Sequence, residues 1–236
     1  VANDREYYQG GQEQLWKIPP GQSPSLYTLE EGWKYQRFWG MGIASADLKM
    51  TGYPAYFVTS MADQRMQFLA DDPGRPTYKD APFSMGTSAH RPFTGGDERP
   101  STGWHAQFED VNNDGLYDLF IAKGNVEKMP DFAEKDPSNL LLQNSEGNFV
   151  EGAEKAGLLN FGRARGAAIA DFNLDGKMDA LIVNRNESVR IWRNVSTDLG
   201  HWLGIRLQQA NSNRDAIGPW IEVKLGDKIM RREISV

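Results

Sequence analysis

Two short segments of the chain carry the same acidic pattern, Asp-x-Asn-x-Asp-Gly-x-x-Asp. They read DVNNDGLYD at 110–118 and DFNLDGKMD at 171–179, and they begin 61 residues apart. Each pattern supplies side-chain oxygens at its first, third, fifth and ninth positions and a glycine at its sixth. Calcium takes roughly 6–8 oxygen ligands in flexible geometry. The pattern therefore predicts a calcium loop in each segment, or about two Ca²⁺ per chain.

The ligands of each loop follow from the way a short chain curls around an ion. The side chains at positions 1, 3 and 5 turn inward, the backbone carbonyl at position 7 follows, and the aspartate at position 9 closes the site. The glycine takes the sharp bend between them. Magnesium fits less well, because it demands a tighter octahedron and keeps its waters. The predicted ligands are Asp110, Asn112, Asp114, Leu116 and Asp118, and Asp171, Asn173, Asp175, Lys177 and Asp179.

Two other kinds of loop share part of this pattern. An EF-hand needs a glutamate at position 12 and a helix on each side, but position 12 is Ile121 in one copy and Ile182 in the other. The apolar runs that follow, at 119–122 and 180–183, favour strands. A turn that binds nothing is the second alternative, since Asp, Asn and Gly favour turns. The conservation of four positions in both copies favours a metal site between two strands.

A third, degenerate copy of the pattern begins at Asp47, 63 residues before the first complete loop. It has Lys49, Thr51 and Ala55 at positions 3, 5 and 9, so we expect no metal there. An apolar or small-residue run precedes each copy, and an apolar run follows it. A period near 60 residues with about four short strands per unit predicts the blades of a β-propeller or another β array.

The loops and their flanking strands resemble the FG-GAP/VCBS-type repeats of β-propellers, including those of integrin α-subunits. The segment HWLGIRL at 201–207, with SNRDAIG at 212–218, resembles the start of the UnbV/ASPIC domain, which follows such repeats in the secreted cartilage-acidic-protein-like family. The resemblance implies an all-β fold. It implies a partial β-propeller of four-stranded, calcium-binding blades in 1–198, with the first blade partial. It also implies a truncated, small β-rich module in 199–236, in which His201 opens a strand.

We expect the repeat pattern to be cut at both ends of the chain. Residues 1–4 align with 121–124 and 182–185, which follow the two complete loops, so we expect a further loop to precede Val1 in the parent protein. Propellers typically need 4–8 blades to close. We therefore expect a fragment of a longer protein, or neighbouring copies that cover the open edges.

Composition limits the compartment and the partners. The 236 residues carry a formal charge of −6 and are 39% hydrophobic, as in soluble globular proteins. No run approaches the roughly 20 apolar residues of a membrane span, and no broad basic patch suggests nucleic acid. Cysteine is absent, which excludes disulfides and thiolate sites. Calcium loops of extracellular modules bind at about 10⁻⁴–10⁻³ M, so we expect a secreted, periplasmic or cell-surface location.

Other candidate residues give weaker signals. His90, His105 and His201 lack the neighbouring ligands that a zinc site needs, so surface or packing roles are favoured. The seven tryptophans are favoured as packing between blades rather than as a sugar platform. Residues 70–102 hold five of the twelve prolines. Long loops often carry binding, so this stretch is the first place to seek a ligand surface, with a structural cover the alternative.

The favoured function is a calcium-binding, non-catalytic module for adhesion, scaffolding or assembly. Its partner would be a protein or glycan at the surface, or copies of the same chain. Two alternatives stay open. One is a fragment of a propeller enzyme acting on polysaccharide or another extracellular substrate. The other is a structural subunit of a homo-polymeric assembly.

Overall fold

The described chain is built from short antiparallel β-strands. The computed structural model describes residues 1–4, 12–36, 38–70, 74–88, 90, 93, 98–126, 133, 135–210 and 213–234. Its only described helical element is the 3-10 turn η1 (Phe83–Met85). The predicted all-β class is confirmed. None of the described helical residues forms a helix long and apolar enough to cross a membrane.

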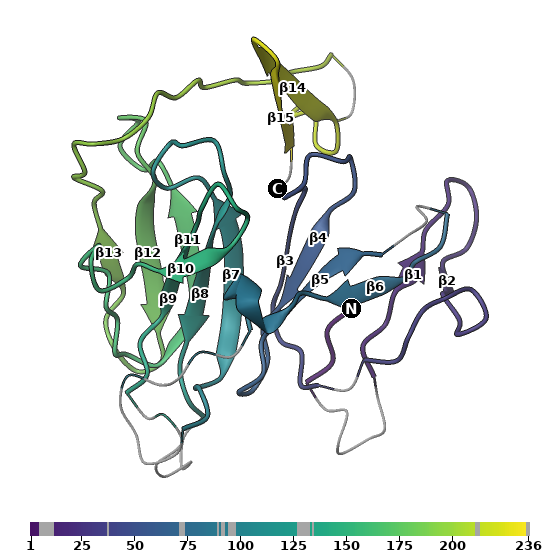
Figure 1. Ribbon diagram of the computed structural model, residues 1–236, viewed down its shortest axis with the longest axis horizontal. Helices are drawn as coiled ribbons and strands as arrows, with labels where there is room; N and C mark the ends of the chain where they lie inside the picture. The colour runs from purple at the N-terminus through teal and green to yellow at the C-terminus, as the bar shows by residue number, and fades with distance from the viewer. Residues whose placement is uncertain are drawn as a thin grey trace.

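Three antiparallel meanders form the body of the molecule (Figure 1). Sheet 1 contains β3 (Ile43–Ala46), β4 (Ala55–Val58), β5 (Arg65–Leu69) and β6 (Tyr78–Asp80). Sheet 2 contains β7 (Gly103–Glu109), β8 (Asp118–Lys123), β9 (Asn139–Gln143) and β10 (Phe149–Glu151). Sheet 3 contains β11 (Ala164–Ala170), β12 (Asp179–Asn184) and β13 (Arg190–Trp192). Consecutive strands pair in each sheet, which is the connectivity of a propeller blade.

The three acidic segments occupy the same place in the three sheets. Loop 1 (47–55), loop 2 (110–118) and loop 3 (171–179) each connect the first strand of a sheet to the second. The ladders around loops 2 and 3 are in matching register, with Glu109 opposite Asp118 and Ala170 opposite Asp179. The prediction that the loops join strands is therefore confirmed, and the flanking helices of an EF-hand are excluded.

The sheets stack face against face, with their first strands side by side. Strand β7 contacts both β3 and β11, so the three first strands lie along one line of the array (Figure 1). One apolar core lies between sheets 1 and 2 and includes Phe57, Phe108 and Leu119. A second core lies between sheets 2 and 3 and includes Phe120 and Ile182. This is the packing of blades about a common axis.

The repeat shows which face of sheet 3 lacks a neighbour. The residue ten positions after the first aspartate of each loop is Phe57, Phe120 or Leu181. Phe57 and Phe120 are 0% and 1% exposed, whereas Leu181 is only half-buried. Its cross-strand partner Ile191 is 68% exposed. In sheets 1 and 2 the next sheet covers this face, whereas no described sheet covers it in sheet 3.

The N-terminal segment covers the opposite face of sheet 1. It contains a two-stranded ladder of β1 (Trp16–Lys17) and β2 (Ser25–Leu26). Downstream of the ladder, Trp33 and Phe38 are buried and line a small pocket together with Ile43 and Tyr56 of sheet 1.

The C-terminal part forms one hairpin of β14 (Trp220–Leu225) and β15 (Lys228–Glu233). The expectation that His201 opens a strand is wrong. Residues 201–207 are irregular, and Trp202 and Leu203 are 58% and 69% exposed. Among the described strands none lies beside this segment to complete a ladder, so its alternating apolar residues have no sheet to join.

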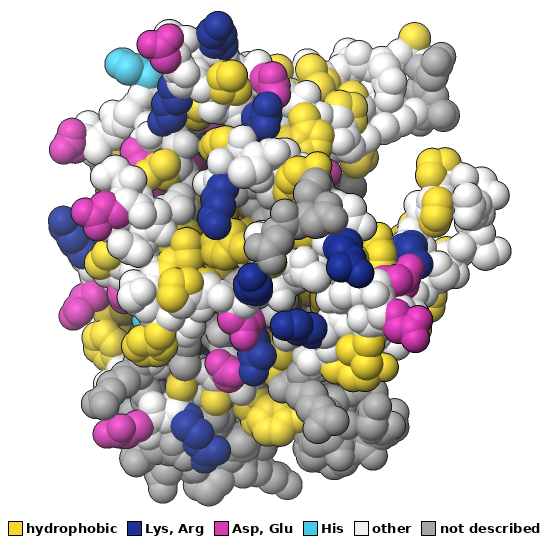
Figure 2. Space-filling model, turned by 45° about the vertical axis from the view of Figure 1, so that its right-hand side comes forward, with side chains coloured by type: hydrophobic (Ala, Val, Ile, Leu, Met, Phe, Trp, Pro, Cys, Tyr) yellow, Lys and Arg dark blue, Asp and Glu magenta, His cyan; other side chains and the backbone are white. Residues whose placement is uncertain are grey.

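The proline-rich stretch 70–102 is described only in part. It includes β6, η1 and the buried Ser101 and Thr102. Residues 71–73, 89, 91–92 and 94–97 lie outside the described residues, so the predicted ligand surface is not tested there. Figure 2 shows one face of the molecule, on which basic, acidic and hydrophobic side chains are interspersed.

Candidate calcium loops

All three loops share one backbone conformation. The fourth and sixth residues of each loop have positive φ angles, a region that the glycine at the sixth position adopts without strain. The φ values are 52° and 85° for Met50 and Gly52, 57° and 85° for Asn113 and Gly115, and 62° and 83° for Leu174 and Gly176. The degenerate loop therefore keeps the fold of the complete loops although it has lost most of their oxygens.

The first aspartate of each loop orders this turn. One carboxylate oxygen accepts the N–H of the fifth residue and the other accepts the N–H of the sixth. For Asp110 the distances are 3.0 and 2.8 Å, and for Asp171 they are 3.0 and 2.7 Å. For Asp47 they are 2.9 and 2.6 Å. The position-1 aspartate thus has a structural role of its own, which explains its presence in a loop with no expected metal.

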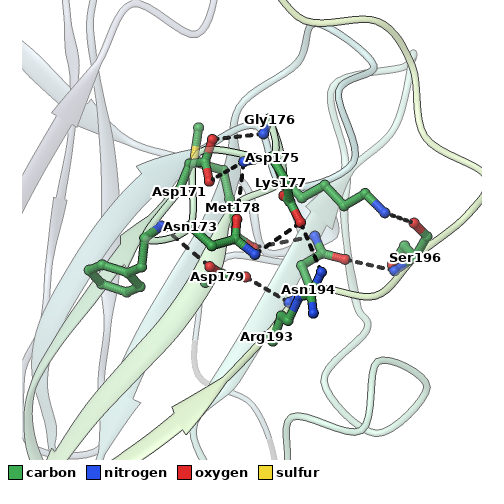
Figure 3. A network of polar contacts seen from close by, with 11 residues as sticks. Asp171, Asn173, Asp175, Gly176, Lys177, Met178, Asp179, Arg193, Asn194 and Ser196 are labelled. Carbon is green, nitrogen blue, oxygen red and sulfur yellow. Dashed lines mark hydrogen bonds and ion pairs between the residues drawn. The ribbon is translucent and has the colours of Figure 1, made fainter.

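The side chains at positions 3 and 5 converge on the same turn. In loop 3, Asn173 donates to Asp175 Oδ2 at 3.0 Å, and Asp175 Oδ1 accepts the N–H of Lys177 at 3.1 Å (Figure 3). In loop 2, Asn112 and Asp114 repeat this arrangement, at 3.0 Å between the side chains and 2.8 Å to the following amide. Three oxygen-bearing side chains therefore gather at the tip of each complete loop.

The ninth aspartate joins the loop to the third strand of its sheet. Asp118 accepts the N–H of Val111 at 3.0 Å and that of Gln143 in β9 at 2.9 Å. Asp179 accepts the corresponding N–H of Phe172 at 3.3 Å and that of Asn194, just after β13, at 2.8 Å. Both carboxylates are buried. Loop 1 has Ala55 here, so it lacks the connection.

In loop 2, burial makes the carboxylate cluster electrostatically unfavourable without a cation. Burial raises the pKa of Asp118 to about 7, against hydrogen bonds from Gln143 and Val111 that lower it. Burial, with a smaller contribution from the charge of Asp114, also raises the pKa of Asp110. A raised carboxyl pKa of this kind means that the charged carboxylate is poorly solvated at its position in the fold. A cation between these groups would remove that cost.

Protein cations already lie beside both loops. The guanidinium of Arg193 is 3.5 Å from Asp175 Oδ2, and that of Arg232 is 4.0 Å from Asp110 Oδ2. Lys177, a predicted ligand through its carbonyl, directs its ammonium away to the carbonyl of Ser196 at 2.7 Å. The lysine side chain therefore does not enter the tip of loop 3.

The residue types of both loops fit a hard cation, since every donor is a carboxylate, amide or carbonyl oxygen. The described part of the chain nevertheless contains no group of three or more His, Asp or Glu side chains gathered around one point. Hydrogen bonds direct the first and ninth carboxylates of each loop to backbone N–H groups. Each such oxygen keeps a lone pair, so an ion would share these oxygens with the amides.

The histidines are not brought together with these loops into one site. Burial lowers the pKa of both His90 and His105, and for His90 the charge of Lys123 adds to the effect. His201 lies on the exposed irregular segment. These positions agree with the predicted packing and surface roles, although the histidines' chemistry is not tested.

Sequence reasoning missed the polar residues that connect the sheets. Gln107 of β7 donates to the carbonyl of Ile169 at 2.8 Å and accepts its N–H at 3.0 Å, which joins sheets 2 and 3. Asn113 donates to the carbonyl of Gly176 at 3.1 Å and joins loop 2 to loop 3. Gln107 lies outside the repeated motif and Asn113 stands at a variable position of it, so no periodic signal marks either residue.

A buried ion pair was also missed. Lys123 and Asp136 are 1% and 4% exposed and lie 2.5 Å apart, Nζ to Oδ2. Asp136 also accepts the N–H and the hydroxyl of Ser101, each at 3.1 Å. Lys123 ends β8 and Asp136 lies 13 residues further along the chain, so only the fold places the two charges together.

Comparison with known proteins supports the repeat assignment. Residues 110–182 match the family model of the FG-GAP-like repeat. The match starts at the first aspartate of loop 2 and ends within β12, so it contains both complete loops. The comparison with curated proteins gave no significant match. Residues 110–182 are therefore similar to the FG-GAP-like repeat, and they lie within an all-β array of antiparallel sheets.

Proposed function

We propose that this chain is a calcium-binding, β-propeller-like module that serves adhesion, scaffolding or assembly outside the cytoplasm, without catalysis. One observation carries the proposal. Loops 2 and 3 keep the same oxygen donors in the same conformation, at the same place in successive sheets of an FG-GAP-like region. Loop 1 keeps the conformation and the first aspartate but lacks the donors at positions 3 and 9, so backbone geometry does not require those two.

The proposed role of the ion is structural. A bound divalent cation supplies positive charge to a cluster of carboxylates. In each complete loop the first aspartate holds the turn, the third and fifth residues present oxygens at its tip, and the ninth is anchored to the third strand. Charge compensation at Asp118 would therefore stabilise the connection between loop 2 and its sheet.

The location is proposed from the expected affinity. Loops of exposed modules bind calcium at about 10⁻⁴–10⁻³ M, and such sites fill only where calcium is abundant. A secreted, periplasmic or cell-surface location meets this condition. The rim that carries the loops would be a rigid surface on which a protein or glycan partner could dock.

Calorimetric titration with calcium tests the proposal. The wild-type chain should show two sites, and the double variant Asp114→Ala/Asp175→Ala should show none. Thr51→Ala is the matched control, since it changes the fifth position of the degenerate loop and should leave both sites intact. Calcium binding that survives the double substitution would assign the metal to other residues.

The open face of sheet 3 favours a second role, as a subunit of an assembly. Ile191 and Val183 are 68% and 43% exposed on a face that sheets 1 and 2 bury. The outer edge of β13 has no partner among the described strands, and such an edge invites pairing. Light scattering should then show association that Ile191→Glu weakens. A strictly monomeric chain at high concentration, with and without calcium, would argue against this role.

A further inference from the structure

The C-terminal hairpin lies over loops 1 and 2 (Figure 1). Its second strand, β15, makes the contacts. Arg231 donates to the carbonyl of Met50 in loop 1 at 3.1 Å. The side chains of Lys228 and Met230 lie so close to Gly115 of loop 2 that an added Cβ would be 3.1 and 3.3 Å from them.

Arg232 connects β15 to the first predicted ligand of loop 2. Its guanidinium approaches Asp110 Oδ2 at 4.0 Å and lies over the ring of Tyr117, 4.0 Å from the centroid. It also donates to the carbonyl of Arg231 at 3.0 Å. The side chain is 29% exposed, and that of Asp110 is 19% exposed. Arg232 is therefore held in place by a ring, a backbone carbonyl and a carboxylate.

Loop 3 has an arginine neighbour of a different kind. Arg193 lies 3.5 Å from Asp175, but its side chain is 68% exposed. An exposed ion pair of this kind contributes little and is easily exchanged for water. Arg193 can swing into solvent when a cation enters loop 3. Arg232 cannot leave loop 2 in this way without giving up the contacts that hold β15.

We infer that Arg232 is the resident counter-ion of loop 2, and that docking of the C-terminal hairpin and calcium binding at loop 2 oppose each other. This inference rests on the proposed calcium function and adds a regulatory element to it. A divalent cation among the carboxylates of loop 2 repels the guanidinium beside Asp110 and competes with it for the same oxygens. Lys228, at the other side of the loop, adds to the repulsion.

Two consequences follow from this coupling. Loop 2 binds calcium more weakly than loop 3, although the motifs are the same. Because coupling between two binding events is reciprocal, calcium at loop 2 also loosens β15 from the rim. The hairpin is then docked on the loops at low calcium and released from them at high calcium.

Single-site titrations of the full chain test the inference. Asp175→Ala removes loop 3 and leaves loop 2 to be measured by calorimetry. In that background Arg232→Gln should tighten calcium binding about tenfold, within the usual range of coupling between sites. Arg232→Lys keeps the charge and should change the affinity by less than about threefold. In the Asp114→Ala background, which leaves loop 3, Arg193→Gln should also change the affinity by less than about threefold.

A second measurement follows the hairpin itself. Calcium should speed hydrogen exchange of the β15 amides in the wild type, and this effect should be absent in Asp114→Ala. If loop 2 binds calcium in the Asp175→Ala background and Arg232→Gln leaves that affinity unchanged, the inference is overturned and the calcium function stands. Absence of calcium binding at both loops in the wild type would refute the calcium function, and the inference with it.

Discussion

Replacing Asp118 by asparagine should change stability in a direction that depends on pH and calcium. The pKa of Asp118 is raised from 3.8 to about 7 by burial. At 1.36 kcal/mol per pH unit, this displacement corresponds to about 4 kcal/mol of destabilisation by the charged form. The group binds its proton more readily in the folded chain than in the unfolded chain. The contribution of Asp118 to the free energy of unfolding is therefore most favourable below pH 3.8 and is lost as the pH rises towards 7.

The asparagine side chain does not titrate, but it leaves one of the two backbone N–H groups without an acceptor. Its amide group can accept from either Val111 or Gln143 but presents N–H to the other, at a cost of about 1–3 kcal/mol. Without calcium, Asp118→Asn should change the stability by no more than about 1 kcal/mol at pH 5, because about 1.6 kcal/mol of the charge cost is already present in the wild type between pH 3.8 and 5. At pH 8 it should be neutral or stabilising by about 1–3 kcal/mol, since the charge cost is gone. With saturating calcium at pH 8 it should destabilise, because a predicted ligand is lost.

Urea unfolding at pH 5 and 8, with chelator or calcium, measures these three values. Asp63→Asn is the matched control, because Asp63 is an exposed partner of Arg65 and should respond little to either condition. The reasoning would be refuted if Asp118→Asn destabilised the chain equally in all conditions, since Asp118 would then act only as a hydrogen-bond acceptor.

Two further substitutions test the structural roles of buried aspartates. Asp136→Ala leaves Lys123 buried without its partner and should cost about 3–5 kcal/mol in urea unfolding, because an uncompensated buried charge is costly. The double variant Asp136→Ala/Lys123→Met should recover much of that loss, and a loss no smaller than that of the single variant would contradict the pairing. Asp47→Ala removes the acceptor for the N–H groups of Thr51 and Gly52 and should cost about 1–3 kcal/mol. The same loss is expected with chelator and with calcium, so a calcium-dependent loss would place a metal in loop 1.

The sequence predicted the elements of this fold because its repeat is local. Nine consecutive residues specify each loop, and the apolar runs on either side of the loops at Asp110 and Asp171 specify the strands. The hairpins could therefore be predicted from the sequence. The residue pattern did not reveal that the first aspartate is a turn organiser. The hydrogen bonds of Asp47 show this, because they persist where the other oxygens are lost.

What the sequence could not predict depends on contacts between distant segments. Gln107 binds a backbone 62 residues away, and Arg231 reaches the carbonyl of Met50 across 181 residues. Residues that form such long-range contacts show no periodicity and no motif in the sequence. The irregular course of 201–207 was missed for a related reason: its alternation is that of a strand, but a strand also needs a neighbour.

A structure determined in the presence of calcium, with anomalous scattering to locate the ion, tests the central claim most directly. We predict one ion in loop 2 and one in loop 3, each bound by oxygens of the first, third, fifth, seventh and ninth residues, and none in loop 1. Ordered solvent alone between the carboxylates of both complete loops, at millimolar calcium, would contradict the account.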